Sequence, residues 1–199
     1  GPPHSTHLIG LDLQRRTGIP WLADFRDPWT TIYYNRFLPR SRRTVLKDRS
    51  MEDAVVKNAD AVVAISATFA DQLRDRSENV RLVLNGYDPS DLTEAKPPKN
   101  EKFTLAYVGN FKPNQDVPAL WSLLAEMLKR DKDFKSKFCL QLVGNVDSHL
   151  EKRLLEIGLG SILEREGYVP HSEAVRKMQA ADMLLFVIPQ SEDNQLILT

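Results

Sequence analysis

Short runs of apolar, often β-branched residues recur along this chain between longer segments with helical spacing. This alternation is typical of parallel strands joined by crossover helices, and strands covered on both faces have near-continuous apolar runs. The sequence therefore predicts an α/β fold, with Rossmann-like parallel sheets and helices on both faces. The expected strands are residues 21–24, 61–65, 81–84, 104–108, 138–143 and 183–188, with a further short strand at 166–169.

Helical spacing is clearest after residue 116, where Val117, Leu120, Trp121 and Leu124 follow an i, i+3, i+4, i+7 pattern. Asn114 or Asp116 is the expected N-cap, because side-chain oxygens of these types accept hydrogen bonds from free backbone N–H groups. Further helices are expected at residues 5–18, 41–58, 148–158 and 172–181.

Residues 85–101 are rich in turn formers and prolines and have no periodicity, which favours a domain boundary. We expect a first domain at residues 1–91, a linker at 92–102 and a second domain at 103–199. The chain starts without methionine and ends in an apolar run, so we expect both ends to be cuts. A first domain cut in this way should expose apolar surface.

Composition narrows the classes of function. Basic and acidic residues number 27 each, so the chain has no net charge, and we expect no nucleic-acid partner. One cysteine, Cys139, excludes an internal disulfide and favours a reducing, cytoplasmic location. No run approaches the roughly 20 apolar residues that a membrane span needs. No cluster has metal-ligand spacing and no Gly-x-Gly-x-x-Gly string is present, so neither a metal nor NAD is predicted.

Eight short strings together resemble one family in their order and spacing. The chain is similar to retaining glycosyltransferases related to glycogen synthase and bacterial mannosyltransferases, a family-4-like group with the GT-B fold. The strings are PPHSTH (2–7), WLADFRDPW (21–29), ADAVVAIS (59–66), LNGYD (84–88), YVGN (107–110), LVG (142–144), GYVP (167–170) and AAD (180–182).

The resemblance implies two Rossmann-like domains, of which the N-terminal one holds an acceptor and the C-terminal one a nucleotide sugar. Residues 1–91 would be the last part of the acceptor-side domain, and residues 103–199 an incomplete donor-binding domain. The implied activity is transfer of a hexosyl unit from a nucleoside diphosphate sugar to a saccharide or lipid-linked acceptor, with retention, in bacterial polysaccharide biosynthesis. The implied reaction needs no cofactor. Peripheral membrane contact would come through the missing N-terminal part, and the fragment alone should be inactive.

The expected donor site lies at the carboxyl ends of the second group of strands, where open α/β sheets bind ligands. Gly109, Asn110 and Lys112 would approach the diphosphate, since glycine admits a phosphate near the backbone and lysine adds a charge. The loop with Gly144 and Asn145 and the segment 167–171 lie at the same ends of expected strands. By the resemblance, the base would rest against the segment 167–171, where Tyr168 and Val169 would contact it and Glu173 would lie nearby.

Each of these residues also has an ordinary structural interpretation. Gly109 can be a plain strand-to-helix turn, Lys112 a solvated side chain, and Glu173 a partner of the helix dipole. Gln115 lies where related enzymes carry a second basic residue. Either another basic residue substitutes for it, or the donor has changed or activity is lost.

The acceptor side is expected around the aromatic and charged string at residues 24–29. Trp29 would stack on a sugar, and Arg26 and Asp27 would supply polar contacts, unless they form a pair that only holds the loop. His4 and His7, near a helix start, would bind acceptor or phosphate, unless they are ordinary surface or capping residues.

Two other functions remain open at this point. The non-hydrolysing epimerases of UDP-N-acetylglucosamine share the architecture and isomerise the sugar without an acceptor. A non-catalytic module that binds nucleotide sugars is the second, and Gln115 is its support in the sequence.

Overall fold

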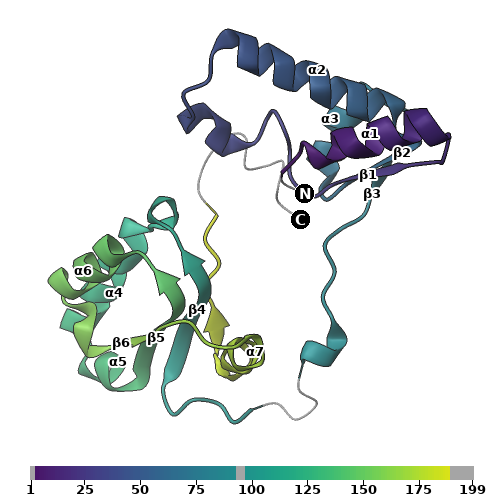
Figure 1. The fold of residues 1–199 in the computed structure, drawn as a ribbon. Coiled ribbons are helices and arrows are strands. Elements are labelled where there is room, and N and C mark those ends of the chain that lie inside the picture. The colour runs from purple at the N-terminus through teal and green to yellow at the C-terminus, as the bar shows by residue number, and fades with distance from the viewer. Residues whose placement is uncertain (1–2, 93–96, 189–199) are drawn as a thin grey trace. The chain divides into compact units, whose positions relative to one another are not determined.

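A computed structural model describes residues 3–92 and 97–188 of the chain. The chain divides into two compact units, the first ending at Gly86 and the second beginning at Tyr87. Each unit has its own parallel sheet, flanking helices and hydrophobic core (Figure 1). The predicted α/β class with parallel sheets is confirmed. No helix in the described residues is both long and apolar enough to cross a bilayer.

The first unit contains a three-stranded parallel sheet in the order β1-β2-β3. The strands expected at residues 21–24, 61–65 and 81–84 are confirmed with shifts of one or two residues at their ends. The elements are α1 (Thr6–Thr17), β1 (Leu22–Phe25), the 3₁₀ turn η1 (Tyr33–Phe37), α2 (Arg42–Asn58), β2 (Ala61–Ala64), α3 (Ala67–Arg74) and β3 (Val80–Leu82).

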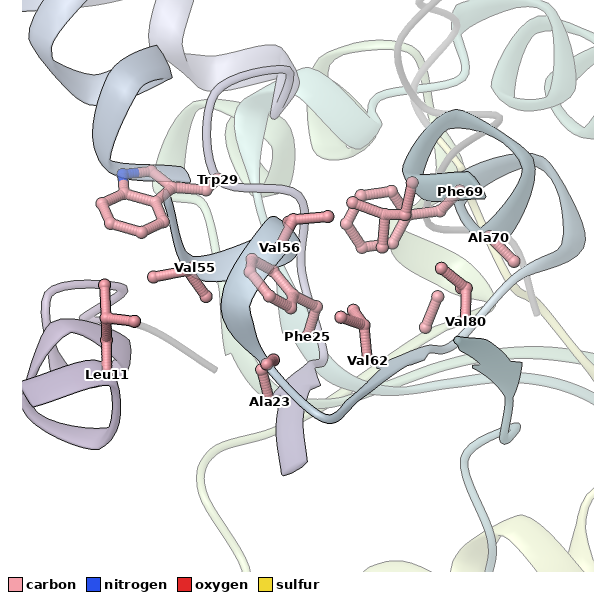
Figure 2. Close-up of a cluster of buried hydrophobic side chains, with 13 residues drawn as sticks. Leu11, Ala23, Phe25, Trp29, Val55, Val56, Val62, Phe69, Ala70 and Val80 are labelled. Carbon is pink, nitrogen blue, oxygen red and sulfur yellow. The ribbon is translucent and has the colours of Figure 1, made fainter. Parts of the chain in front are cut away.

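Helix α2 supplies the centre of the first core. Figure 2 shows its Val55 and Val56 among side chains of the sheet, with Phe25 of β1 and Phe69 of α3 beside them. All four are at most 1% exposed. Burial of one such side chain stabilises a fold by roughly 1.5–3 kcal/mol, so this cluster fixes α2 and α3 on the sheet.

The predicted exposed apolar surface is present in the first unit. Leu22 of β1 is 54% exposed, and Ile9 and Leu13 of α1 are 62% and 54% exposed. Within the described residues, β1 pairs with β2 alone.

The second unit contains a four-stranded parallel sheet in the order β6-β5-β4-β7, which follows the 3-2-1-4 strand order of Rossmann-like folds. Its elements are the 3₁₀ turn η2 (Pro89–Asp91), β4 (Phe103–Phe111), the 3₁₀ turn η3 (Pro113–Gln115), α4 (Pro118–Arg130), α5 (Lys132–Lys137), β5 (Phe138–Val146), α6 (Ser148–Glu156), the 3₁₀ turn η4 (Leu159–Ser161), β6 (Leu163–Glu166), α7 (His171–Ala180) and β7 (Met183–Leu184).

Helices cover both faces of this sheet. Figure 1 shows α4 and α6 on one side and α7 on the other. Leu140 and Leu142 of β5 pack with Trp121 of α4 and Leu154 of α6, and none of the four side chains is exposed. The fully buried Trp121 therefore fixes α4 across the central strands.

Several boundaries differ from the prediction. The short strand expected at 166–169 is wrong, because the chain pairs with β5 earlier, over Leu163–Glu166. The strand expected at 183–188 has only Met183–Leu184 in the sheet. Strands β4 and β5 continue past residues 108 and 143, since their pairing persists to the last pair, Phe111 with Val146.

The expected cap of α4 is also wrong. Helix α4 begins at Pro118, with Val117 as N-cap and no side-chain cap. Asp116 is not a cap because its carboxylate accepts a hydrogen bond from Trp121 Nε1 at 2.8 Å and pairs with Arg153 at 2.5 Å. These contacts hold the start of α4 against α6.

Candidate functional site

Two paired glycines shape the carboxyl edge of the second sheet. Gly109 of β4 lies opposite Gly144 of β5, and their φ angles are +148° and +105°. A Cβ atom on Gly144 would lie 2.2 Å from the carbonyl oxygen of Gly109. Since side chains rarely tolerate such φ angles, the two strands can continue here only because both residues are glycine. Bare backbone is therefore presented at the edge where open α/β sheets bind ligands.

A cavity of about 440 Å³ opens beside these glycines. Val108, Val143 and Ala174 give it apolar walls, and the start of α7 closes one side. Six of the eight predicted donor-site residues line it: Gly109, Asn110, Gly144, Asn145, Tyr168 and Val169. The structure thus brings together the carboxyl ends of β4 and β5 and the segment before α7, which are separate in the sequence. An apolar hollow with backbone and amide groups at its edge suits a planar, hydrogen-bonding ligand.

The polar groups around the cavity are partly held in place. The carbonyl oxygen of Asn110 accepts a hydrogen bond from Tyr107 Oη at 3.0 Å, and Asn145 Nδ2 lies 3.4 Å from Asn110 Oδ1. Tyr168 is 90% exposed, so its side chain remains free to cover a ligand.

His171 is a residue of this cavity that the sequence analysis missed. It is the first residue of α7, lines the cavity, and its Nε2 lies 3.1 Å from Asp91 Oδ2. The signal in the sequence was its place two residues after Val169, at the carboxyl end of an expected strand, where open α/β sheets bind ligands.

Lys112 does not line the cavity. Its side chain is exposed in the loop after β4, and its backbone N–H donates to Gln115 Oε1 at 2.9 Å. Strand β4 continues beyond Gly109 to Phe111, and the 3₁₀ turn η3 separates it from α4. Pro118, the first residue of α4, has no N–H to offer a phosphate.

Gln115 has a structural role at this point. Besides accepting from Lys112, it donates through Nε2 to the carbonyl oxygen of Val187 at 3.1 Å. The side chain therefore ties the loop after β4 to the segment after β7, across the point where the strand order reverses. A lysine or arginine could donate to Val187 but could not accept from the Lys112 N–H.

Glu173 lies apart from the cavity beside Gly109 and Gly144. It lines a separate hollow of about 230 Å³ with Arg176 and Lys177. Glu173 occupies the first turn of α7, where a carboxylate complements the helix dipole.

Among the residues expected on the acceptor side, Arg26 connects two loops of the first unit. Its Nε lies 2.9 Å from Asp24 Oδ2, and its Nη1 lies 3.1 Å from Asn85 Oδ1. The alternative of an Arg26–Asp27 pair is wrong, because the Arg26 guanidinium contacts Asp24 and Asn85 instead. Asp27 is partly exposed beside it. Arg26 thereby presents a partly exposed positive charge at the carboxyl edge of β1.

The other acceptor-side residues are more enclosed than expected. Trp29 is 7% exposed and belongs to the first core. The expectation that its ring is open for stacking on a sugar is therefore wrong. His7 is 7% exposed and stacks on Phe25 with ring centroids 4.4 Å apart, and His4 stacks on Trp29 at 5.5 Å. Burial lowers the pKa of His4 and lowers that of His7 to about 4, so His7 is neutral near pH 7 and offers no cation to a phosphate.

Cys139 is a core residue of β5, and burial raises the pKa of its thiol to about 12. A thiol with so high a pKa is a poor nucleophile. Within residues 3–92 and 97–188, no group of three His, Cys, Asp or Glu side chains is arranged to hold a metal ion.

The chain is similar to known proteins in its three-dimensional structure and not detectably in its sequence. No family model matches the sequence, and no curated protein matches it significantly. Sucrose-phosphate synthase from Thermosynechococcus elongatus has a TM-score of 0.61 at 20% identity, over 90% of this chain and 47% of that protein. HepE of Anabaena, solved with UDP and glucose, has a TM-score of 0.59 at 16% identity, over 90% and 49%.

WaaG, a glycosyltransferase of lipopolysaccharide biosynthesis, has a TM-score of 0.56 at 14% identity, over 88% of this chain and 55% of that protein. The chain spans about half the length of these solved proteins. These likenesses show that the chain has a fold shared with glycosyltransferases of the GT-B type.

Proposed function

We propose that the chain is part of a glycosyltransferase that transfers a hexosyl unit from a nucleoside diphosphate sugar to a saccharide or lipid-linked acceptor. Retention of the anomeric configuration, a role in bacterial polysaccharide biosynthesis and a cytoplasmic location belong to the same proposal. Residues 103–188 would bind the donor, and the unit that contains Arg26 would contribute to the acceptor side.

The observation that carries the proposal is the cavity beside Gly109 and Gly144. It lies at the carboxyl ends of β4 and β5, and its apolar walls and backbone groups suit a nucleoside base. The fold is shared with HepE, whose structure contains UDP and glucose. In the proposed complex, the base lies against Tyr168 and Val169, and the diphosphate extends toward Lys112.

Calorimetric titration of the 199-residue chain with uridine, UDP, GDP and ADP tests the donor site. We expect one nucleoside diphosphate to bind, with the base deciding which one. Ala174→Phe, which fills the cavity wall, should weaken this binding on the order of tenfold or more because the ring occupies the space of the base. Ala119→Phe, at an exposed position of α4, is the matched control and should bind as the wild type does.

Activity is tested with the full-length enzyme, its donor and a panel of saccharide and lipid-linked acceptors. A product that appears only with acceptor, and whose anomeric proton has the configuration of the donor, supports a retaining transferase. An isomerised donor formed without acceptor would instead show an epimerase. If no nucleoside diphosphate binds the chain, or Ala174→Phe binds as tightly as the wild type, the donor site is wrongly placed.

A further inference from the structure

The hollow of about 230 Å³ that Glu173 lines has no part in the proposed glycosyl transfer. Helix α7 forms one of its walls, the segment 97–100 forms another, and Gln141 of β5 also lines it. Its lining shares no residue with that of the cavity beside Gly109 and Gly144, so the two spaces are separate. We call this space the α7 hollow.

Polar contacts hold the two walls of the α7 hollow together. Lys99 Nζ donates to the carbonyl oxygen of Ala181 at 2.5 Å and lies 3.6 Å from Asp182 Oδ1. The other oxygen of this carboxylate, Asp182 Oδ2, accepts from the Thr104 N–H at 2.9 Å. These contacts attach the segment before β4 to the end of α7, so the hollow is a built feature of the second unit.

Two opposite charges line the α7 hollow without partners. Glu173 and Arg176 lie three residues apart on α7, and both are exposed. Neither side chain has an ion pair or hydrogen bond within the residues that the structure describes. Lys177, by contrast, pairs with Glu166 at 2.5 Å, so its charge is compensated. The hollow therefore offers one free carboxylate and one free guanidinium.

Gln141 adds a polar group that lacks a partner. Its Oε1 is buried and accepts no hydrogen bond within residues 3–92 and 97–188. A buried carbonyl oxygen in this state is unfavourable, because it has lost water and gained nothing in return. The last torsion of a glutamine side chain is soft, so a rotation of the amide presents this oxygen to the hollow. A ligand N–H group there would supply the missing hydrogen bond.

The remaining lining limits the size and the body of a ligand. Pro97, Pro98 and Ala180 give the α7 hollow apolar surface. Since a cavity of about 150 Å³ holds benzene, a hollow of this volume has room for roughly eight to ten non-hydrogen atoms. A simple anion would be repelled by Glu173 and a simple cation by Arg176, so a zwitterion uses both charges.

We propose that the α7 hollow binds a free α-amino acid with a small apolar side chain. Arg176 donates two parallel N–H···O bonds to its carboxylate, a geometry that suits the guanidinium group. Glu173 and the Gln141 oxygen accept from its ammonium group, and its side chain packs against the prolines of the segment 97–100. The proposal goes beyond glycosyl transfer, because an amino acid is neither the donor nor the acceptor proposed above.

Calorimetric titration of the 199-residue chain with L-valine tests the proposal. We expect L-valine to bind with one site per chain. Isovalerate, which lacks only the amino group, and isobutylamine, which lacks only the carboxylate, should each bind on the order of tenfold more weakly, because each loses one charge-assisted contact. The proposal is overturned if 10 mM L-valine gives no binding, or if either analogue binds as tightly as L-valine.

Substitutions then place the site. Arg176→Gln and Glu173→Gln should each weaken L-valine binding on the order of tenfold, since each removes one of the two charges and keeps a side chain of similar size. Lys129→Gln, at an exposed position of α4, is the matched control and should bind as the wild type does. Arg176→Gln should keep the wild-type unfolding midpoint, because its side chain is exposed and unpaired. Wild-type affinity in both α7 variants would show that L-valine binds elsewhere, and the proposal would fail.

Discussion

The carbonyl oxygen of Gly109 occupies the space that a side chain at Gly144 would need, with 2.2 Å between that oxygen and an added Cβ. Neither partner can move aside easily, because both residues lie inside paired strands and the pairing continues for two more residue pairs. The two glycines are thus one structural unit.

Replacing Gly144 by alanine should therefore destabilise the second unit by about 2–4 kcal/mol, through a backbone clash and an unfavourable φ. Urea unfolding followed by circular dichroism measures this change. Gly167→Ala is the control and should be near neutral, because an added Cβ there has no neighbour within 4 Å and the φ is not in the left-handed region. Equal unfolding midpoints for the two variants would contradict the geometry described here.

The second prediction concerns the role of Lys112 in binding the donor diphosphate. If its ammonium contacts the donor diphosphate, Lys112→Met should weaken UDP binding about tenfold to a hundredfold, the value of a charge-assisted phosphate contact of roughly 1.5–3 kcal/mol. Uridine binding should not change, because the nucleoside has no phosphate. Calorimetric titration with UDP and with uridine distinguishes a lost phosphate contact from a disturbed cavity. An equal loss of affinity for both ligands would show that the substitution disturbs the cavity itself.

The strands could be predicted because buried parallel strands are read directly from apolar runs such as residues 138–143. Their ends could not, because Gly109 and Gly144 look like turn residues in the sequence, whereas cross-strand pairing continues through them to Val146. Six residues of the predicted donor site line one cavity because the carboxyl ends of parallel strands share one edge of a sheet. The role of Gln115 depends on Val187, 72 residues later, and no local pattern reveals such a contact.

Burial explains the remaining differences. Trp29 follows a charged string and looks like a binding aromatic, but its large apolar surface packs into the first core. Whether such a side chain packs in the core or contacts a ligand depends on which helices cover the loop. That is decided by the tertiary structure and not by the local sequence.

A buried ion pair gives a prediction for the first unit. Glu52 is 1% exposed, and its carboxylate pairs with Arg76 at 2.8 Å and accepts from the Thr30 N–H at 3.0 Å. Arg76→Met should destabilise the unit by about 3–5 kcal/mol, because it leaves the carboxylate buried and unpaired. The double variant Arg76→Met/Glu52→Gln should recover part of this loss, since no charge then remains buried, and thermal unfolding measures both. Arg74→Met, on the exposed end of α3, is the control and should change little.

The last prediction concerns His7 and the stability of the first unit in acid. The folded imidazole has a pKa of about 4 because it is buried, whereas the unfolded one titrates near 6.5. Between these values the unfolded state binds more protons, so the free energy of unfolding is unaffected above about pH 6.5 and falls as the pH falls toward 4, by at most about 1.4 kcal/mol per pH unit. Burial lowers the pKa of His4 as well, so both histidines act in the same direction.

His7→Phe should make this dependence shallower, because a phenyl ring keeps the stacking on Phe25 and has no proton to gain. The measurement is urea unfolding of the wild type and the variant at several values between pH 4 and 7.5. His149→Gln, at an exposed position of α6, should keep the wild-type profile. If His7→Phe and the wild type lose stability in parallel over this range, the acid sensitivity belongs to other groups, and His7 is protonated in the folded protein at a higher pH than its burial indicates.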